Sequence, residues 1–317
     1  MKAIVGLHHV TAFASNPQRN LDFYTGVLGQ RFVKKTVNFD DPGTYHFYFG
    51  DDAGSPGTIY TSRCPWPSAA RGTVGAGKTT HIAYSVPRKS IEYWFTRLQS
   101  LGVSATRGAR FDGEEVLVFA DPDGMGLEIV GYDPATEITP PRFADVPTEH
   151  ALRGLFGATL LQRELAAVEP TLRLMGFHPV AHEGPRTRFA PEGDAHGRFI
   201  DIVANPAAPR GRMGAGSVHH IAFRAADDLS QLEWRQQIEK TLSVTAVQER
   251  DYFRSIYFRE PEGVLFELAT DPPGFTLDEP LESLGETLCT PEWLASRRFA
   301  IEASLLPITL HKAGAAS

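Results

Sequence analysis

The chain repeats one order of hydrophobic patterns. An alternating segment that predicts a strand comes first, and an amphipathic segment that predicts a helix follows, as over 90–101 and 229–242. Short β-rich runs separated by Gly, Asp and Pro then predict further strands, such as 115–119 and 255–258. Each unit therefore predicts a strand, a helix and three strands. One face of such a sheet packs under the helix, and the other is free to line a cup.

Two of these units match each other closely. The segment THIAY at 80–84 corresponds to HHIAF at 219–223, and a glutamate follows the inner histidine of each by 47 residues, at Glu128 and Glu267. Two looser copies begin with strands near residues 7 and 155. A repeat of this kind is the signature of an internally duplicated architecture.

The sequence thus predicts an α+β fold of four βαβββ modules, two in each half of the chain. We expect the N-terminal half at 1–140 and the C-terminal half, with a tail, at 148–317. The segment 134–147 contains four prolines and is interpreted as the linker.

Strand alternation predicts which side chains face the cups, because successive side chains point to opposite faces. One parity of the opening strands is apolar and should pack under the helices: Val10, Ala12, Ile82, Tyr84, Ile221 and Phe223. The opposite parity, together with the closing strands, should place polar groups in the cups: His9, Thr11, His81, Glu128, His220 and Glu267. The aromatic run Phe47, Tyr48 and Phe49 could line a cup, but as a block it is favoured to be ordinary strand core.

His9, His220 and Glu267 are residue types that bind a metal. Two histidines and one carboxylate form the facial triad of non-haem Fe(II) oxygenases, which leaves positions open for O₂ and substrate. The alternative is a hydrogen-bonded pocket without metal. A second set could form around His81, Glu128 and Asp201, but Gly157 stands where its other histidine would be, so a vestigial hydrogen-bonded pocket is favoured there.

Composition narrows the classes of function. The formal net charge of −7 over 317 residues argues against a nucleic-acid-binding protein, which usually carries a basic patch. No run of about 18 apolar residues predicts a membrane span, and the start of the chain lacks the features of a signal peptide. Cys64 and Cys289 make neither a disulfide framework nor a zinc motif, so we expect a reducing, cytoplasmic compartment.

Several motifs carry a specific resemblance. The four modules resemble the vicinal oxygen chelate superfamily, which includes glyoxalases, bleomycin resistance proteins and extradiol dioxygenases. The segments LHHVT at 7–11, SVHHIAF at 217–223, RDYFRSIYFREP at 250–261 and GVLFE at 263–267 are similar to ring-cleaving dioxygenases that act on hydroquinones. The tail from 284 to 298 is also similar to this family. The fold expected from the resemblance is two vicinal-oxygen-chelate halves.

The resemblance implies an Fe(II) enzyme that cleaves a hydroquinone-like or catechol-like ring with both atoms of O₂. The implied metal ligands are His9, His220 and Glu267, although the same set also holds Mn(II). Further roles are implied for His8, Thr11, His219, Arg250 and Tyr257. Arg250 would stabilise a phenolate, Tyr257 would donate a hydrogen bond to the substrate, and Thr11 would orient a ligand or water. Parity, however, points His8 and His219 away from the metal, so a bulge or an indirect hydrogen bond would be needed.

By spacing, Phe111 occupies the position in the second module that Arg250 has in the fourth, which supports chemistry in the first and fourth modules only. Two other functions stay open. One is a glyoxalase-type lyase or isomerase, which uses a metal without redox chemistry and commonly has two carboxylate ligands. The other is a metal-free small-molecule binding protein of the same fold. The expected partners are a small aromatic substrate and O₂, with no nucleic acid and no membrane, and the sequence leaves open whether the chain forms a homo-oligomer.

Overall fold

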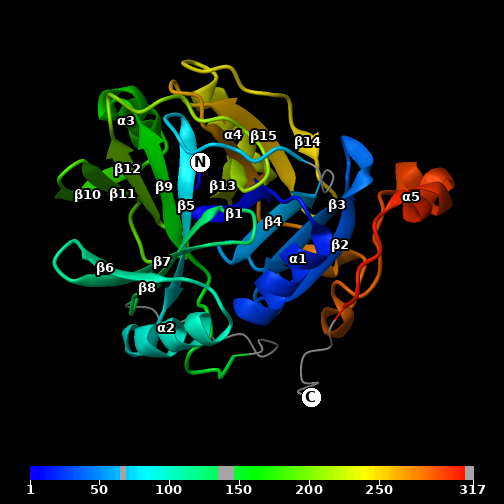
Figure 1. Cartoon of the computed structure of the whole chain (residues 1–317). Helices are drawn as coiled ribbons and strands as arrows, with labels where there is room; N and C mark the ends of the chain where they lie inside the picture. Colours follow the sequence, from blue (N-terminus) through cyan, green and yellow to red (C-terminus); the bar gives the residue numbers. More distant parts are fainter. Residues whose placement is uncertain (65–68, 135–145, 311–317) are drawn as a thin grey trace.

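A computed structural model describes residues 1–64, 69–134 and 146–310, and it contains the four predicted modules in order (Figure 1). The first has β1 (Leu7–Phe13), α1 (Pro17–Asp22) continued by η1 (Phe23–Val27), β2 (Arg31–Asn38), β3 (Asp41–Gly50) and β4 (Ile59–Cys64). The second has β5 (Lys78–Val86), η2 (Arg88–Ser90), α2 (Ile91–Ser100), β6 (Thr106–Arg110), β7 (Glu114–Ala120) and β8 (Gly126–Gly131). The third has β9 (Leu155–Gln162), α3 (Leu165–Leu174), β10 (His178–Glu183), β11 (Arg186–Ala190) and β12 (Phe199–Ala204). The fourth has β13 (Ser217–Ala225), α4 (Asp228–Ile238), β14 (Gln248–Glu249), β15 (Arg254–Arg259) and β16 (Leu265–Thr270). The predicted α+β fold and its strand–helix–three-strand modules are confirmed.

Two eight-stranded sheets combine the modules across the halves of the chain. One sheet has the order β14-β15-β16-β13-β1-β4-β3-β2 and joins the fourth module to the first. The other has the order β10-β11-β12-β9-β5-β8-β7-β6 and joins the third to the second. In each sheet the two opening strands pair antiparallel at the centre, β1 with β13 and β5 with β9. The division at 1–140 and 148–317 stays a prediction, since most of the linker at 134–147 lies outside the described residues.

The two faces of each sheet pack as strand parity predicts. The apolar positions of the opening strands join the largest hydrophobic core, where Val10, Ile82 and Phe223 are fully buried against the helices and neighbouring strands. The opposite faces form smaller apolar clusters, one around Ala222 and one around Ala83. Because both faces of each sheet are covered, the polar side chains that line each cup are largely buried.

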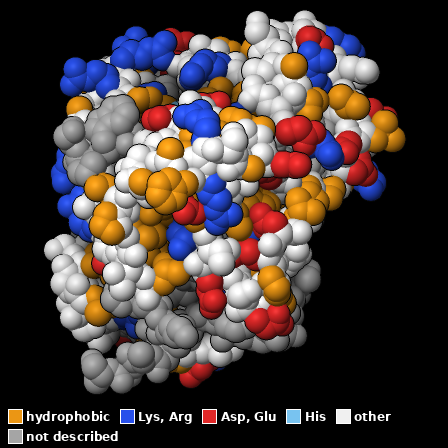
Figure 2. All heavy atoms as spheres, turned by 90° about the vertical axis from the view of Figure 1, so that its right-hand side faces the viewer, with side chains coloured by type: hydrophobic (Ala, Val, Ile, Leu, Met, Phe, Trp, Pro, Cys, Tyr) orange, Lys and Arg blue, Asp and Glu red, His pale blue; other side chains and the backbone are white. Residues whose placement is uncertain are grey.

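The residues after β16 form a tail along the edge of the first sheet. It contains η3 (Phe275–Leu277), η4 (Leu281–Ser283), η5 (Glu292–Arg297) and α5 (Arg298–Ser304). Lys34 of β2 is fully buried beneath it, and Nζ lies 2.5 Å from Asp278 and 2.6 Å from Glu279. The face of the molecule in Figure 2 intersperses apolar and charged side chains. None of the helices in the described ranges is long and apolar enough to cross a membrane.

Candidate metal centre

Three strands bring His9, His220 and Glu267 together at the centre of the first sheet. His9 comes from β1, His220 from β13 and Glu267 from β16, so the ligand set spans the first and fourth modules. Nε2 of His9 lies 3.3 Å from Nε2 of His220 and 3.4 Å from Oε2 of Glu267. Nε2 of His220 lies 2.8 Å from the same carboxylate oxygen. The three side chains are at most 2% exposed.

This arrangement fits a divalent metal ion. Three atoms bound at about 2.1 Å to one octahedral ion lie about 3 Å apart, which is close to the observed spacing. Burial lowers the pKa of His220 to about 4, so its imidazole is neutral at neutral pH and offers a lone pair. Oε2 of Glu267 is buried and has no well-directed hydrogen bond within the described part of the chain. Buried lone pairs that converge in this way need a cation or protons to stabilise them.

Burial alone would raise the pKa of Glu267, but His9 and His220 lower it well below its usual value. The carboxylate is therefore ionised at neutral pH. Its other oxygen, Oε1, accepts a short hydrogen bond from the hydroxyl of Ser255 on β15. Ser255 fixes the orientation of the carboxylate, and the sequence analysis did not identify it.

Two β-bulges explain how His8 and His219 reach the ligands. In the pairing of β1 with β13, Leu7 lies opposite Phe223 and His9 opposite Ala222, so His8 is skipped. Further along, Thr11 and Ala12 lie opposite His220 and Val218, so His219 is skipped. A bulge adds one residue to a strand and turns its side chain out of the regular alternation. The expectation from strict parity, that these two side chains point away, therefore fails at these positions.

Each extra histidine contacts the Nδ1 atom of the adjacent candidate ligand. Nδ1 of His8 lies 2.9 Å from Nδ1 of His9, and Nδ1 of His219 lies 2.7 Å from Nδ1 of His220. Burial lowers the pKa of both outer imidazoles far below the usual value, so they stay neutral. A neutral acceptor at Nδ1 keeps the proton of the inner ring there and leaves Nε2 free to bind a metal.

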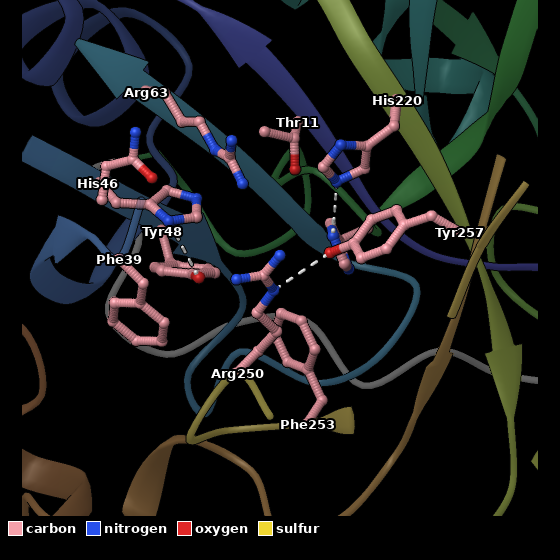
Figure 3. A pocket seen from close by; sticks show the side chains of 11 residues that line it. Thr11, Phe39, His46, Tyr48, Arg63, His220, Arg250, Phe253 and Tyr257 are labelled. Atoms are coloured by element: carbon pink, nitrogen blue, oxygen red, sulfur yellow. Dashed lines mark hydrogen bonds between the residues drawn. The ribbon is translucent and has the colours of Figure 1, made fainter. Parts of the chain in front are cut away.

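The remaining predicted residues line a pocket beside the ligands, with about 310 Å³ of space (Figure 3). Nε of Arg250 donates to the hydroxyl of Tyr257 at 3.3 Å, and another nitrogen of Arg250 donates to Gln248 at 2.5 Å. Thr11 faces the same space and accepts a hydrogen bond from Thr61 at 3.0 Å. The structure therefore brings all eight sequence-predicted side chains to one centre. Their roles as ligands and catalytic groups stay predictions.

The sequence analysis missed several pocket-lining residues: Asn38, Phe39, His46, Arg63 and Phe253. His46 lies 2.8 Å from Thr61 and 3.3 Å from the hydroxyl of Tyr48, which extends the hydrogen-bonded row that begins at Thr11. The alternation in β3 and β4 could have found His46 and Arg63, because those positions share one face. The expectation for the aromatic run holds for Phe47 and Phe49, which join the main core, but Tyr48 lines the pocket.

The second cup contains a network of arginines and carboxylates. Arg110 lies 2.9 Å from Glu128, while Arg186 and Arg188 lie 2.8 and 2.7 Å from Asp201. Among the described residues, no cluster of metal-binding side chains occurs there. The interpretation of this cup as a hydrogen-bonded pocket therefore accounts for its contacts.

The spacing comparison of the second and fourth modules was wrong in one detail. Spacing placed Phe111 at the position of Arg250, which suggested that the second module lacks an arginine. Arg110, one residue earlier, reaches Glu128. Phe111 instead packs against Arg188, whose guanidinium carbon lies 4.4 Å from the centre of the Phe111 ring. Counting residues along the chain does not account for the local turn before β7, where Phe111 has a positive φ of 45°.

A further group of possible ligands, Asp278, Glu279 and Cys289, lies in the tail. The ammonium of Lys34 already occupies the space between the two carboxylates, at 2.5 and 2.6 Å. A buried cation of the chain itself satisfies this group, so it does not indicate a metal site.

Comparisons with known proteins identify relatives along the whole chain. Residues 6–129 match the model of the Glyoxalase/Bleomycin resistance protein/Dioxygenase superfamily. The provisionally named ring-cleaving dioxygenase MhqO of Bacillus subtilis is 45% identical, over 98% of this chain and 99% of that protein. The chlorohydroquinone/hydroquinone 1,2-dioxygenase of Sphingobium indicum is 33% identical, over 89% of this chain and 90% of that protein. A provisionally named dioxygenase from Bacillus subtilis, solved as a crystal structure, matches with a TM-score of 0.93 and 45% identity, over 98% of this chain and 100% of that one.

Proposed function

Because the chain belongs to the ring-cleaving dioxygenase family of the glyoxalase and dioxygenase superfamily, we propose that it is an Fe(II)-dependent, extradiol-type dioxygenase of hydroquinone-like or catechol-like aromatics. The observation that carries this proposal is the convergence of His9, His220 and Glu267 in a buried cup. Two imidazoles and one carboxylate leave three positions of an octahedral ion for substrate and O₂. Mn(II) would fit the same ligands.

The proposed reaction opens the ring beside a carbon that bears a hydroxyl and incorporates both atoms of O₂. A bound Fe(II) would lower the pKa of the phenol and exchange electrons with O₂. The chain's own residues bind and orient the substrate. The pocket offers aromatic walls, including Phe253, against which a flat ring can pack.

Arg250 and Tyr257 form the polar side of this site. The guanidinium keeps its positive charge at any working pH, so it stabilises a phenolate held in the pocket. Burial raises the pKa of Tyr257 above its usual value, so the hydroxyl keeps its proton and can donate it in a hydrogen bond to the substrate. Thr11 can orient a water or ligand from the opposite side, because Thr61 already donates to its hydroxyl.

Metal loading and oxygen uptake test the proposal together. Protein loaded anaerobically should bind iron near one ion per chain, and it should consume O₂ when hydroquinone is added. His9→Ala should abolish both, although His9 is distant in sequence from Glu267. The matched control is His81→Ala in the second cup, which should keep both.

The same measurements distinguish the alternatives. Zinc or nickel with thiol-dependent turnover would indicate a glyoxalase-type enzyme. Absence of metal, with unchanged function in Glu267→Ala, would refute both enzymes. Bound iron and full turnover in His9→Ala would show that the ligands come from elsewhere.

A further inference from the structure

One guanidinium in the pocket has no buried carboxylate beside it among the described residues. Arg63 lies on β4, on the same face as Thr61, and its side chain is 13% exposed. Its Nε is buried without a hydrogen-bond partner, and the described residues accept no hydrogen bond from the rest of the group. The nearest carboxylate is that of Asp40, 3.9 Å away and 65% exposed. An ion pair of that length with an exposed partner compensates little of the cost of removing an arginine from water.

The second cup shows that this chain normally neutralises such groups. Arg188 there pairs with Asp201 at 2.7 Å and with Glu114 at 2.6 Å. Asp201 of β12 lies opposite Thr159 of the opening strand β9. The corresponding position on β4, opposite Thr11 of β1, is Thr61.

The first cup therefore lacks the carboxylate that binds arginine in the second. None of the described pocket-lining residues is acidic. Glu267 lies beneath the pocket, directed at His9 and His220. Within the described parts of the chain, only the exposed Asp40 offers Arg63 a carboxylate, so an anion that pairs closely with Arg63 would have to be a ligand.

A second guanidinium strengthens the positive field of the pocket. Arg250 and Arg63 come from different modules and point into the same space, with His46 and Tyr48 to one side of it (Figure 3). After burial, Arg63 is the largest cause that lowers the pKa of His46, so its charge acts across the pocket. Arg250 is engaged with Tyr257 and Gln248, whereas no residue in the described ranges is recorded as accepting a hydrogen bond from Arg63.

We propose that the preferred substrate is a hydroquinone with an acidic ring substituent, a carboxylate or carboxymethyl group, and that Arg63 binds this group. A guanidinium offers two parallel N–H donors that match a carboxylate. The inference rests on the proposed function, because it assumes that the hydroxyl-bearing side of the ring faces His9, His220 and Glu267. A neutral hydroquinone would leave the largely buried guanidinium of Arg63 with only the exposed Asp40 as a counter-charge.

The test compares 2,5-dihydroxybenzoate and (2,5-dihydroxyphenyl)acetate with unsubstituted hydroquinone on the iron-loaded protein. We expect kcat/KM for the better acid to exceed that for hydroquinone by at least about tenfold, the effect of one charge-assisted hydrogen-bond pair. Arg63→Met should lower this ratio at least about tenfold, mainly by raising KM for the acid. The matched control, Arg173→Met on the exposed side of α3, should keep the ratio.

A second measurement needs no turnover and no variant. Under anaerobic conditions, the acid should raise the unfolding temperature of the metal-loaded protein more than hydroquinone does at the same concentration. Equal or better turnover and stabilisation with hydroquinone would overturn the inference. Equal losses for both substrates in Arg63→Met would assign Arg63 to the second ring hydroxyl and would also overturn it. Absence of O₂ uptake with every aromatic would refute the proposed function instead, while the unfolding temperatures would still decide whether the pocket recognises the acid.

Discussion

Replacing His8 with phenylalanine tests how the fold prepares His9 to bind a metal. Nδ1 of His8 lies 2.9 Å from Nδ1 of His9, and the neutral ring of His8 can accept the proton that His9 carries there. Phenylalanine fills nearly the same space beside Phe253, whose ring centre lies 5.1 Å from that of His8, but it accepts no hydrogen bond. Nothing then holds the proton of His9 on Nδ1, and Nε2 is no longer reserved for the metal.

The expected loss follows from that single contact. Removing the outer hydrogen-bond partner of a metal-binding histidine typically weakens metal affinity by about 10–100-fold, or about 1.4–2.7 kcal/mol. The metal-free protein should change less in unfolding free energy, because His9 can move its proton to Nε2, toward Glu267 at 3.4 Å. A selective loss of metal affinity is therefore the signature of this role.

Metal affinity can be measured anaerobically by competition with a chromogenic chelator, alongside denaturant unfolding of the metal-free protein. His182→Phe is the matched control, because His182 is exposed on β10, where its recorded hydrogen bond is to its hairpin partner Thr187 at 3.0 Å. If folded His8→Phe binds Fe(II) within about twofold of the original protein, the proposed tautomer control is wrong.

Three further predictions concern the framework of the site. Lys34→Met should lower the unfolding free energy by about 3–5 kcal/mol, because it leaves Glu279 buried without its cation. Adding Glu279→Gln to Lys34→Met should recover much of this loss. If the single and the double variant were equally stable, the prediction would be wrong. Arg188→Met should also lower the unfolding free energy, but by less than Lys34→Met, because buried Asp201 keeps Arg186 as a partner at 2.8 Å. Iron content and turnover per folded chain should stay unchanged, and lost iron would instead indicate a metal role for the second cup. Burial lowers the pKa of His46 well below its usual 6.5, so its contribution to stability is complete above pH 6.5 and is lost as the pH falls toward the folded-state value. Metal-free His46→Gln should therefore lose stability less steeply than the original protein between pH 6.5 and 5, with a difference of up to about 1.4 kcal/mol per pH unit, and parallel profiles would refute this.

Sequence patterns were sufficient for the modules and for the candidate ligands. The strand–helix–three-strand order depends on local periodicity, and α2 and β7 lie within about one residue of their predicted bounds. The choice of His9, His220 and Glu267 depends on strand parity and on the equal interval in two modules. Strand parity and the repeated interval can be read from the sequence because side chains alternate on any regular strand, whatever its neighbours in the sheet.

Other features of the site depend on pairing between distant strands. Local alternation directs His8 and His219 away from the ligands, and only the register of β1 against β13 creates the bulges that turn them back. Ser255 reaches Glu267 because β15 and β16 are neighbours in the sheet. Spacing alone likewise assigned Phe111 to the position of Arg250, although it is Arg110 that reaches the carboxylate of Glu128 in the second cup.

The sequence by itself determined the repeated module, the face of each strand and the residue types able to bind a metal. The tertiary structure decided the bulged register of β1 against β13, the pairing of arginines with carboxylates in the second cup, and the exposed Asp40 as the nearest carboxylate to Arg63 in the first. The physical reason is that periodicity is a property of neighbouring residues. Charge compensation instead depends on which side chains, distant in sequence, are brought within a few ångströms of one another in a buried site.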